Sequence, residues 1–121
     1  MKNIKDIAVI IRGKNESKWL VQCINSINKQ INISFDIFYI DNNSDDFSAV
    51  IARRMGVFVA EYKEEYLPGR MLNYGIKFAH KRGEFKSFLF LSSHCIINEI
   101  DAFHKLFCAL DSKKKIRYVY I

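Results

Sequence analysis

Polar side chains that could bind a phosphorylated ligand or a metal ion gather in four short clusters of this sequence. The clusters are Arg12 with Asn15 and Glu16, residues 41–44, Arg70 with Asn73, and residues 92–94. Carboxylates and amides can hydrogen-bond the base and hydroxyl groups of a nucleoside, and a guanidinium can bind a phosphate through two parallel hydrogen bonds. Asx and serine residues also stabilise turns by bonding to nearby backbone, so each cluster has a purely structural interpretation as well.

Three of these clusters directly follow short apolar runs. Residues 7–11, 35–40 and 87–91 are rich in β-branched and aromatic side chains, which is typical of buried strands in a parallel sheet. The carboxyl ends of parallel strands meet at one edge of the sheet, where ligands bind. The cluster of Arg70 and Asn73 opens an expected helix, whose free N–H groups and dipole favour a phosphate. We therefore expect one binding site at the carboxyl edge of the sheet.

Strands and helices alternate along the whole chain. The pattern predicts strands over residues 7–11, 35–40, 57–60, 87–91 and 116–121, and helices over residues 16–29, 46–55, 71–81 and 99–110. This alternation indicates an α/β fold, with a three-layer, Rossmann-like, mostly parallel sheet and helices on both faces. With 121 residues, the chain is predicted to be a single domain.

Turn and cap chemistry predicts several helix ends. Asn15 is expected to cap the first helix, Ser44 or Asp45 the second, and Gly56 is expected to end the second helix in the left-handed conformation. Helical spacing predicts that these apolar side chains face the core: Trp19, Leu20, Cys23, Ile24, Ile27, Phe47, Val50, Ile51, Leu72, Ile76, Ala79, Ile100, Phe103, Leu106, Phe107 and Leu110.

The composition favours a globular protein with an anionic partner. Half of the residues are hydrophobic, the net charge is +6 and the pI is about 9.3. Nucleotides, phosphorylated lipids and an acidic membrane face all fit this charge, whereas the scattered basic residues argue against nucleic acid. The cysteines, Cys23, Cys95 and Cys108, are odd in number and far apart, so we expect reduced, mostly buried thiols in the cytosol. No signal peptide or membrane-spanning run is expected.

Several well-known motifs are absent from the sequence. Only Gly13 follows the first expected strand, so the G-x-G-x-x-G of dinucleotide-binding domains is missing. The P-loop pattern and the G-x-S-x-G elbow of hydrolases are also missing. A receiver domain would need an aspartate at the end of the third strand, where the chain has Ala60, Glu61 and Tyr62.

Four stretches together resemble the nucleotide-binding half of family 2 glycosyltransferases of the GT-A fold. Residues 9–16 are similar to the opening "VVIPTYNE" strand, and residues 19–30 to the helix that follows it. Residues 39–46, YIDNNSDD, resemble "VVDNGSTD", and residues 68–76, PGRMLNYGI, resemble a "GRALNxGI" segment of one branch. The four stretches occur in the family's order and cover most of the chain.

The resemblance implies a site for a nucleoside-diphosphate sugar. Asp41 and Asn42 would contact the base and ribose, and the amide at position 42, where many relatives have a second Asp, implies a base preference different from uridine. Arg70 and Asn73 would lie beside the diphosphate. The full expected site consists of Arg12, Asn15, Glu16, Asp41, Asn42, Ser44, Arg70 and Asn73.

The sequence departs from the family at the metal-binding motif. Relatives usually carry D-x-D after the fourth strand, a carboxylate pair that holds Mg²⁺ or Mn²⁺, and this chain has Ser92, Ser93 and His94. Serine is a poor ligand for these hard cations, so a divalent metal is doubtful as a cofactor. His94 could ligate Mn²⁺, bind a phosphate directly, or serve only as a hydrogen-bonded residue at a strand end.

Two functions remain open at this stage. The resemblance implies sugar transfer to a glycan or lipid-linked acceptor in polysaccharide or glycolipid synthesis, in the cytoplasm and at the inner membrane face with peripheral association. The alternative is a non-catalytic nucleotide-binding or interaction module. No catalytic residue is assigned, and Asp111 is expected at a helix end, so residues 1–121 alone are expected to lack the catalytic base. The apolar final strand suggests a homodimer through that strand, or a truncated front part of a longer protein.

Overall fold

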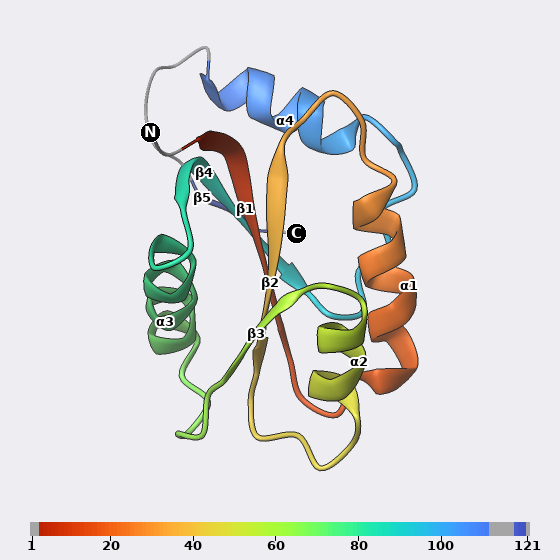
Figure 1. Cartoon of the computed structure of the whole chain (residues 1–121), viewed down its shortest axis with the longest axis vertical. Helices are drawn as coiled ribbons and strands as arrows, with labels where there is room; N and C mark the ends of the chain where they lie inside the picture. The colour runs from red at the N-terminus through yellow and green to blue at the C-terminus, as the bar shows by residue number, and fades with distance from the viewer. Residues whose placement is uncertain (1–2, 112–117, 121) are drawn as a thin grey trace.

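The computed structural model describes residues 3–111 and 118–120, which form five strands and four helices. Figure 1 shows them in chain order. The elements are β1 (Ile4–Gly13), α1 (Ser17–Asn28), β2 (Phe35–Asp41), α2 (Ser48–Arg54), β3 (Phe58–Glu61), α3 (Pro68–His80), β4 (Glu84–Ser92), α4 (Ala102–Asp111) and β5 (Tyr118–Tyr120). Every expected element is present, with ends shifted by at most three residues.

The strands form one parallel sheet in the order β3-β2-β1-β4-β5. The chain moves outward from β1 to β3 and then returns to the other side of β1 with β4, so the direction of winding reverses between β1 and β4. In open sheets of this kind, ligands bind at such a reversal, outside the carboxyl ends of the strands. The register brings Arg12 opposite Ser92, and Gly13 opposite Asp41.

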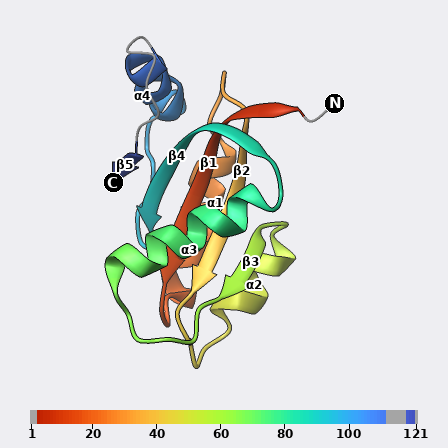
Figure 2. The same cartoon turned by 90° about the vertical axis from the view of Figure 1, so that its left-hand side faces the viewer.

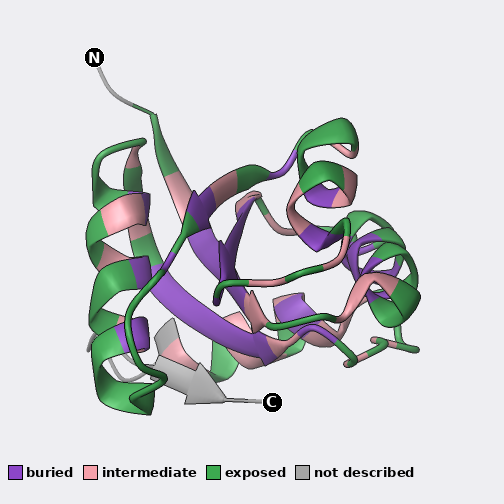
Figure 3. Cartoon of the chain, turned by 90° about the horizontal axis from the view of Figure 1, so that it is seen from below, coloured by how far each residue is buried: buried purple, intermediate pink, exposed green. Residues whose placement is uncertain are grey.

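Helices cover both faces of the sheet, which confirms the three-layer prediction. On one face α1, α2 and α4 pack on strand side chains such as Val9, Ile11 and Tyr39. On the other face α3 packs on Ala8, Ile10 and neighbouring strand residues. Figure 2 shows α3 in front of the sheet with α1 and α2 behind it, and Figure 3 shows buried strands between helices whose outer sides are exposed.

Two glycines act as the local geometry requires. Gly56 has φ of 80°, and its N–H donates to the carbonyl of Arg53 while the N–H of Val57 donates to that of Ala52. These two bonds make a Schellman motif at the end of α2, as the sequence predicted. Gly75 lets α3 approach the sheet, since a Cβ there would lie 2.9 Å from Cγ2 of Ile10.

The predicted N-caps are wrong. Asn15 has φ of 54° and lies before α1, whose first residue is Ser17. The N–H of Ser17 instead donates to Oδ2 of Asp46, at 3.1 Å. Oδ1 of Asp46 accepts from the N–H of Ser48, the first residue of α2. A carboxylate from one loop thus serves two helix starts, which spacing within one helix cannot reveal.

Several residues expected in the core are exposed, because the helices begin later or rotate away from the predicted face. Phe47 precedes α2 and is 74% exposed, and Ile100 precedes α4 and is 54% exposed. Trp19 and Val50 also lie on outer helix faces. The expectation of mostly buried cysteines is wrong as well: only Cys23 is buried, Cys95 is half-buried and Cys108 is exposed, and none forms a disulfide.

The last strand lies at the edge of the sheet beside β4. The remaining residues of the predicted strand 116–121, and the side chain of Asp111, lie outside the described part of the chain. No helix among the described residues combines the length and apolar character needed to cross a membrane.

Candidate functional site

A cavity of about 150 Å³ lies at the carboxyl ends of β1 and β4, where the order in which the chain adds strands reverses. It is lined by the carboxyl ends of β1 and β4 and by residues from three loops and α3: Arg12, Gly13, Lys14, Glu16, Asn42, Tyr66, Met71, Ser92 and Ser93. We call this the switch-point cavity. It brings together three of the predicted site residues, Arg12, Glu16 and Asn42, from segments far apart in the sequence.

The carboxylate of Asp41, at the end of β2, accepts hydrogen bonds from Tyr39 on the same strand and from Ser44 in the loop that follows. Its side chain is 3% exposed, and Oδ1 accepts from the hydroxyls of Tyr39 at 2.8 Å and Ser44 at 2.6 Å. Oδ2 accepts from the N–H of Ser44 at 3.1 Å. Burial, and then the hydrogen bond to Asp41, raise the pKa of Tyr39 well above its usual range. Asp41 and Ser44 therefore form a closed network at the end of β2.

Asn42 ties the loop after β3 to the strand ends. Its Nδ2 donates to the carbonyl oxygens of Tyr62 at 3.1 Å and Glu64 at 3.2 Å. Its backbone N–H donates to the carbonyl oxygen of Gly13 at 2.9 Å. The residue still lines the switch-point cavity, although it is only 7% exposed. Asn42 thus both positions the loop and contributes to the cavity wall.

Asn15 joins the loops after β1 and β2 and does not line the cavity. Its N–H donates to Oγ of Ser44 at 2.8 Å, and its Oδ1 accepts from the N–H of Asp45 at 2.7 Å. Asp46 continues this junction through its bonds to Ser17 and Ser48. Partial burial opposes ionisation of Asp46, but the hydrogen bonds from Ser48 and Ser17 outweigh it and lower the pKa of this carboxyl.

Two cations from the end of β1 face the cavity. Arg12 donates from Nη1 to the hydroxyl of Tyr66, and its guanidinium carbon lies 5.8 Å from the centre of that ring. Lys14 is exposed. Neither side chain forms an ion pair within the described part of the chain. Their charges are therefore available to an anionic ligand.

The residues after β4 differ in their surroundings. Ser93 is fully buried and its hydroxyl has no hydrogen-bond partner among the described residues. It lies against Gly13, where a Cβ would approach its Oγ to 2.6 Å. His94 lies outside the cavity lining, with Nδ1 3.1 Å from Oγ of Ser92 and 3.7 Å from Oε1 of Glu16.

The predicted phosphate residues Arg70 and Asn73 line a neighbouring cavity rather than the switch-point cavity. This second cavity has a volume of about 290 Å³ and is also lined by Tyr62, Glu64, Tyr74 and Lys77. Arg70 and Asn73 are both exposed on the first turns of α3. Met71, between them in sequence, is buried and lines the switch-point cavity, so the helix separates the two groups.

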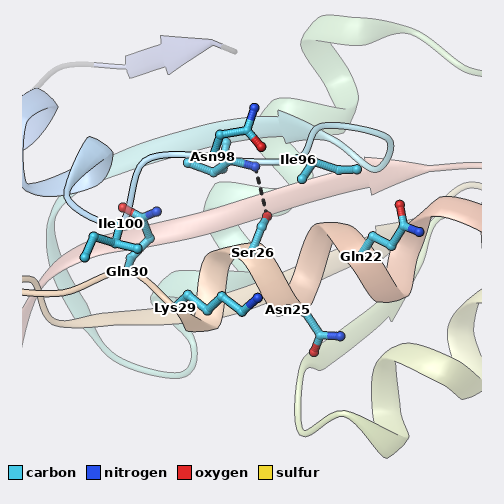
Figure 4. A pocket seen from close by; sticks show the side chains of 9 residues that line it. Gln22, Asn25, Ser26, Lys29, Gln30, Ile96, Asn98 and Ile100 are labelled. Carbon is cyan, nitrogen blue, oxygen red and sulfur yellow. Dashed lines mark hydrogen bonds between the residues drawn. The ribbon is translucent and has the colours of Figure 1, made fainter.

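A larger cavity, of about 350 Å³, lies between α1 and the segment before α4 (Figure 4). Amide side chains line it, including Gln22, Asn25 and Asn98, and a hydrogen bond from the N–H of Ile97 to Oγ of Ser26 joins its two sides. It shares no residue with the switch-point cavity and contains none of the predicted site residues.

The donor groups at the strand ends do not fit a divalent metal. Among the described residues, no three histidine, cysteine, aspartate or glutamate side chains come close enough to hold one ion. Glu16 and His94 lie close together but supply only one carboxylate and one imidazole. The carboxylate of Asp41 is buried and already accepts three hydrogen bonds. Mg²⁺ and Mn²⁺ prefer several hard oxygen ligands. The two cationic side chains that line the same cavity would repel either ion.

A family model for "Glycosyl transferase family 2" matches residues 8–116 of the chain. The match covers β1 to α4 and includes every residue of the switch-point cavity. The chain belongs to glycosyltransferase family 2. No curated protein matches it significantly in sequence.

Solved structures share the fold of this family 2 domain. S. aureus TarS residues 1–349 in complex with UDP superposes with a TM-score of 0.73 at 22% identity, covering 88% of this chain and 32% of that one. The same fragment with UDP-GlcNAc gives the same score and identity, covering 88% and 31%. The mannosyltransferase PcManGT from Pyrobaculum calidifontis, with GDP-Man and Mn²⁺, gives 0.68 at 14% identity, covering 89% and 32%. The chain thus spans about a third of these chains.

Several residues that line the cavity, and one support, are absent from the expected site. Tyr66, which binds Arg12, lies 54 residues away in a loop whose path no pattern predicts. Ser93 belongs to the polar cluster 92–94 noted in the sequence, but its burial against Gly13 depends on the register of β1 and β4. Tyr39 could have been found, because residues two apart on a strand point to the same face, here that of Asp41.

Proposed function

We propose that this family 2 domain binds a nucleoside-diphosphate sugar in the switch-point cavity, as the donor-binding part of a glycosyltransferase. One observation carries the proposal: a cavity beside the point where the strand order reverses is lined by polar groups from three strand ends and by Arg12 and Lys14, which form no ion pair among the described residues. The reversal is where such folds bind nucleotides. The cations suit a diphosphate and Asn42 suits a base or a ribose.

The neighbouring cavity at the start of α3 extends the proposed site. Arg70 and Asn73 lie next to the switch-point cavity, on the other side of Met71. We assign the nucleotide to the switch-point cavity. Arg70 and Asn73 would contact the part of the donor that extends beyond this cavity. Asn15, Asp41 and Ser44 have a different role in this proposal, because their bonds to one another and to the backbone fix the loops around the ligand.

The relatives suggest the wider reaction. TarS is solved with UDP-GlcNAc and PcManGT with GDP-Man, so a nucleotide-linked hexose is the proposed donor class. A glycan or lipid-linked acceptor, polysaccharide or glycolipid synthesis, and a cytoplasmic location with peripheral membrane association complete the proposal. The net charge of +6 is compatible with an anionic membrane surface.

Amide chemical-shift mapping by NMR tests where the nucleotide binds. Addition of UDP or GDP should shift the amides of residues 12–16, Asn42, and residues 92–93, and should leave those of residues 96–100 unchanged. Shifts confined to the cavity between α1 and residues 96–100, or no shifts at millimolar nucleotide, would contradict the assignment.

A matched pair of glycine variants tests the cavity itself. A Cβ at Gly13 would meet Oγ of Ser93 at 2.6 Å, whereas a Cβ at Gly69 would meet no atom within 4 Å. Gly13→Ala should weaken nucleotide binding about tenfold, because a methyl group forced against the buried Ser93 and Tyr39 would displace the strand ends that line the cavity, and such overpacking costs roughly 1–3 kcal/mol. Gly69→Ala should bind as the parent does, and equal binding by both variants would place the ligand elsewhere.

A further inference from the structure

The switch-point cavity combines two kinds of group that are normally satisfied in a folded protein. Arg12 and Lys14 have no carboxylate partner in the described part of the chain, and the buried hydroxyl of Ser93 has no hydrogen-bond partner there. A buried polar group without a partner costs roughly 1–3 kcal/mol. All three residues line the same cavity. Arg12 and Lys14 can therefore bind an anion there, whereas the hydroxyl of Ser93 has no exposed surface for a ligand to contact.

The acidic side of the cavity is small by comparison. Glu16 is the one carboxylate in the lining, and its Oε1 lies 3.7 Å from Nδ1 of His94. Asp41 is buried at 3% exposure and its carboxylate is already bonded to Tyr39 and Ser44. A dication placed here would face two positive side chains with a single adjacent carboxylate, so the charge balance favours an anion over a metal.

We propose that Arg12 and Lys14 hold the diphosphate of the donor directly, without a divalent metal. The inference rests on the proposed nucleotide function and states how its most highly charged group is bound. Arg12 presents a planar fork of donors, oriented by its bond to Tyr66, and Lys14 adds a mobile point charge.

Calorimetric titrations of the 121-residue chain with uridine, UMP and UDP, and with the guanosine series, test the proposal. Each is carried out once in EDTA and once in MnCl₂. UDP or GDP should bind at least tenfold more tightly than its nucleoside in EDTA, since charge-assisted hydrogen bonds are worth roughly twice neutral ones. Adding Mn²⁺ should change this ratio by less than about threefold if the protein's own cations already neutralise the diphosphate.

Two variants locate the effect. Lys14→Gln should weaken diphosphate binding by about tenfold, with little effect on the nucleoside. Lys81→Gln, which removes the same charge from the exposed end of α3, is the matched control and should change binding less than twofold. Thermal melts establish that each variant is folded.

The outcomes separate this inference from the proposed function. Diphosphate binding that appears only with Mn²⁺ would overturn the metal-free arrangement and leave the nucleotide function standing. Nucleoside binding with no gain from the phosphates would overturn it too. Absence of binding by every nucleoside and nucleotide, with or without metal, would overturn the proposed function and this inference together.

Discussion

The end of β2 and the ends of β1 and β4 meet at one edge of the sheet, but their polar groups are used differently. At the end of β2, the carboxylate of Asp41 accepts three hydrogen bonds, and Ser44 accepts a further one from Asn15 in the loop after β1. At the ends of β1 and β4, Arg12 and Lys14 lack ion-pair partners and the buried Ser93 lacks a hydrogen-bond partner within the described residues. The first region is a self-contained support, and the second carries two cations that an anionic ligand would neutralise.

This difference separates residues that build a site from residues that contact its ligand. Asp41 and Ser44 are polar, adjacent and at a strand end, which are the signals that suggested binding. Their partners lie within the chain, so substitution there should act first on stability. The cavity groups have few partners in the protein, so substitution there should act first on binding and little on stability.

The largest effect is expected for Asp41→Ala. It removes the acceptor of Tyr39 and Ser44 and leaves a buried phenol unsatisfied, so the free energy of unfolding should fall by about 3 kcal/mol. Urea denaturation measures this loss. In a Tyr39→Phe background the same substitution should cost about 1 kcal/mol less, and strictly additive losses would show that the Tyr39 bond contributes nothing to stability.

The second effect concerns Asp46, which supports the starts of α1 and α2. Asp46→Asn should lower the free energy of unfolding by about 1 kcal/mol at pH 7 through weakened charge-assisted capping bonds. Because the folded pKa of Asp46 is lowered, its contribution is fully present above the unfolded value of about 3.9 and is lost as the pH falls through the folded value.

Stability curves of the parent and the Asp46→Asn variant should therefore converge below about pH 4. Asp45→Ala is the matched control, since the structure shows only the backbone N–H of this exposed residue in a hydrogen bond. A constant gap between the two curves from pH 7 to pH 3 would show that the charge of Asp46 is not what supports the helices.

A smaller effect of opposite sign is expected at the cavity. Ser93→Ala removes a buried hydroxyl that has no hydrogen-bond partner among the described residues, so the free energy of unfolding should stay the same or rise by up to about 1 kcal/mol. Urea denaturation without nucleotide measures it. A loss of more than about 1 kcal/mol would place Ser93 among the supporting residues and erase the contrast with Asp41.

The smallest effect is expected for Tyr66→Phe. The hydroxyl of Tyr66 accepts a hydrogen bond from Arg12, while the ring contact with the guanidinium remains in phenylalanine. Diphosphate binding should weaken by about two- to threefold, because an exposed bond of this kind contributes about 0.5 kcal/mol. Titration of UDP and GDP measures it, and unchanged stability with tighter binding would show that Tyr66 competes with the ligand for Arg12.

Much of the fold could be predicted from the sequence because its signals are local. Apolar runs such as residues 7–11 and 87–91 indicated buried strands, and Gly56 ended α2 as expected. The expectation that polar residues after the strands meet at the carboxyl edge followed from the parallel sheet alone. The order β3-β2-β1-β4-β5 places Arg12, Glu16 and Asn42 in one cavity, as that reasoning expected.

Only the tertiary structure decided which polar residues support the site and which line its cavity. Asp46 accepts a hydrogen bond from Ser17, 29 residues away, and Arg12 donates one to Tyr66, 54 residues away. Ser93 is buried against Gly13 on the neighbouring strand. A polar residue's role depends on whether another part of the chain satisfies its hydrogen bonds, and that depends on strand register and loop path. Residue type and spacing determine which groups reach the edge of the sheet, and long-range packing determines which of them remain free to bind.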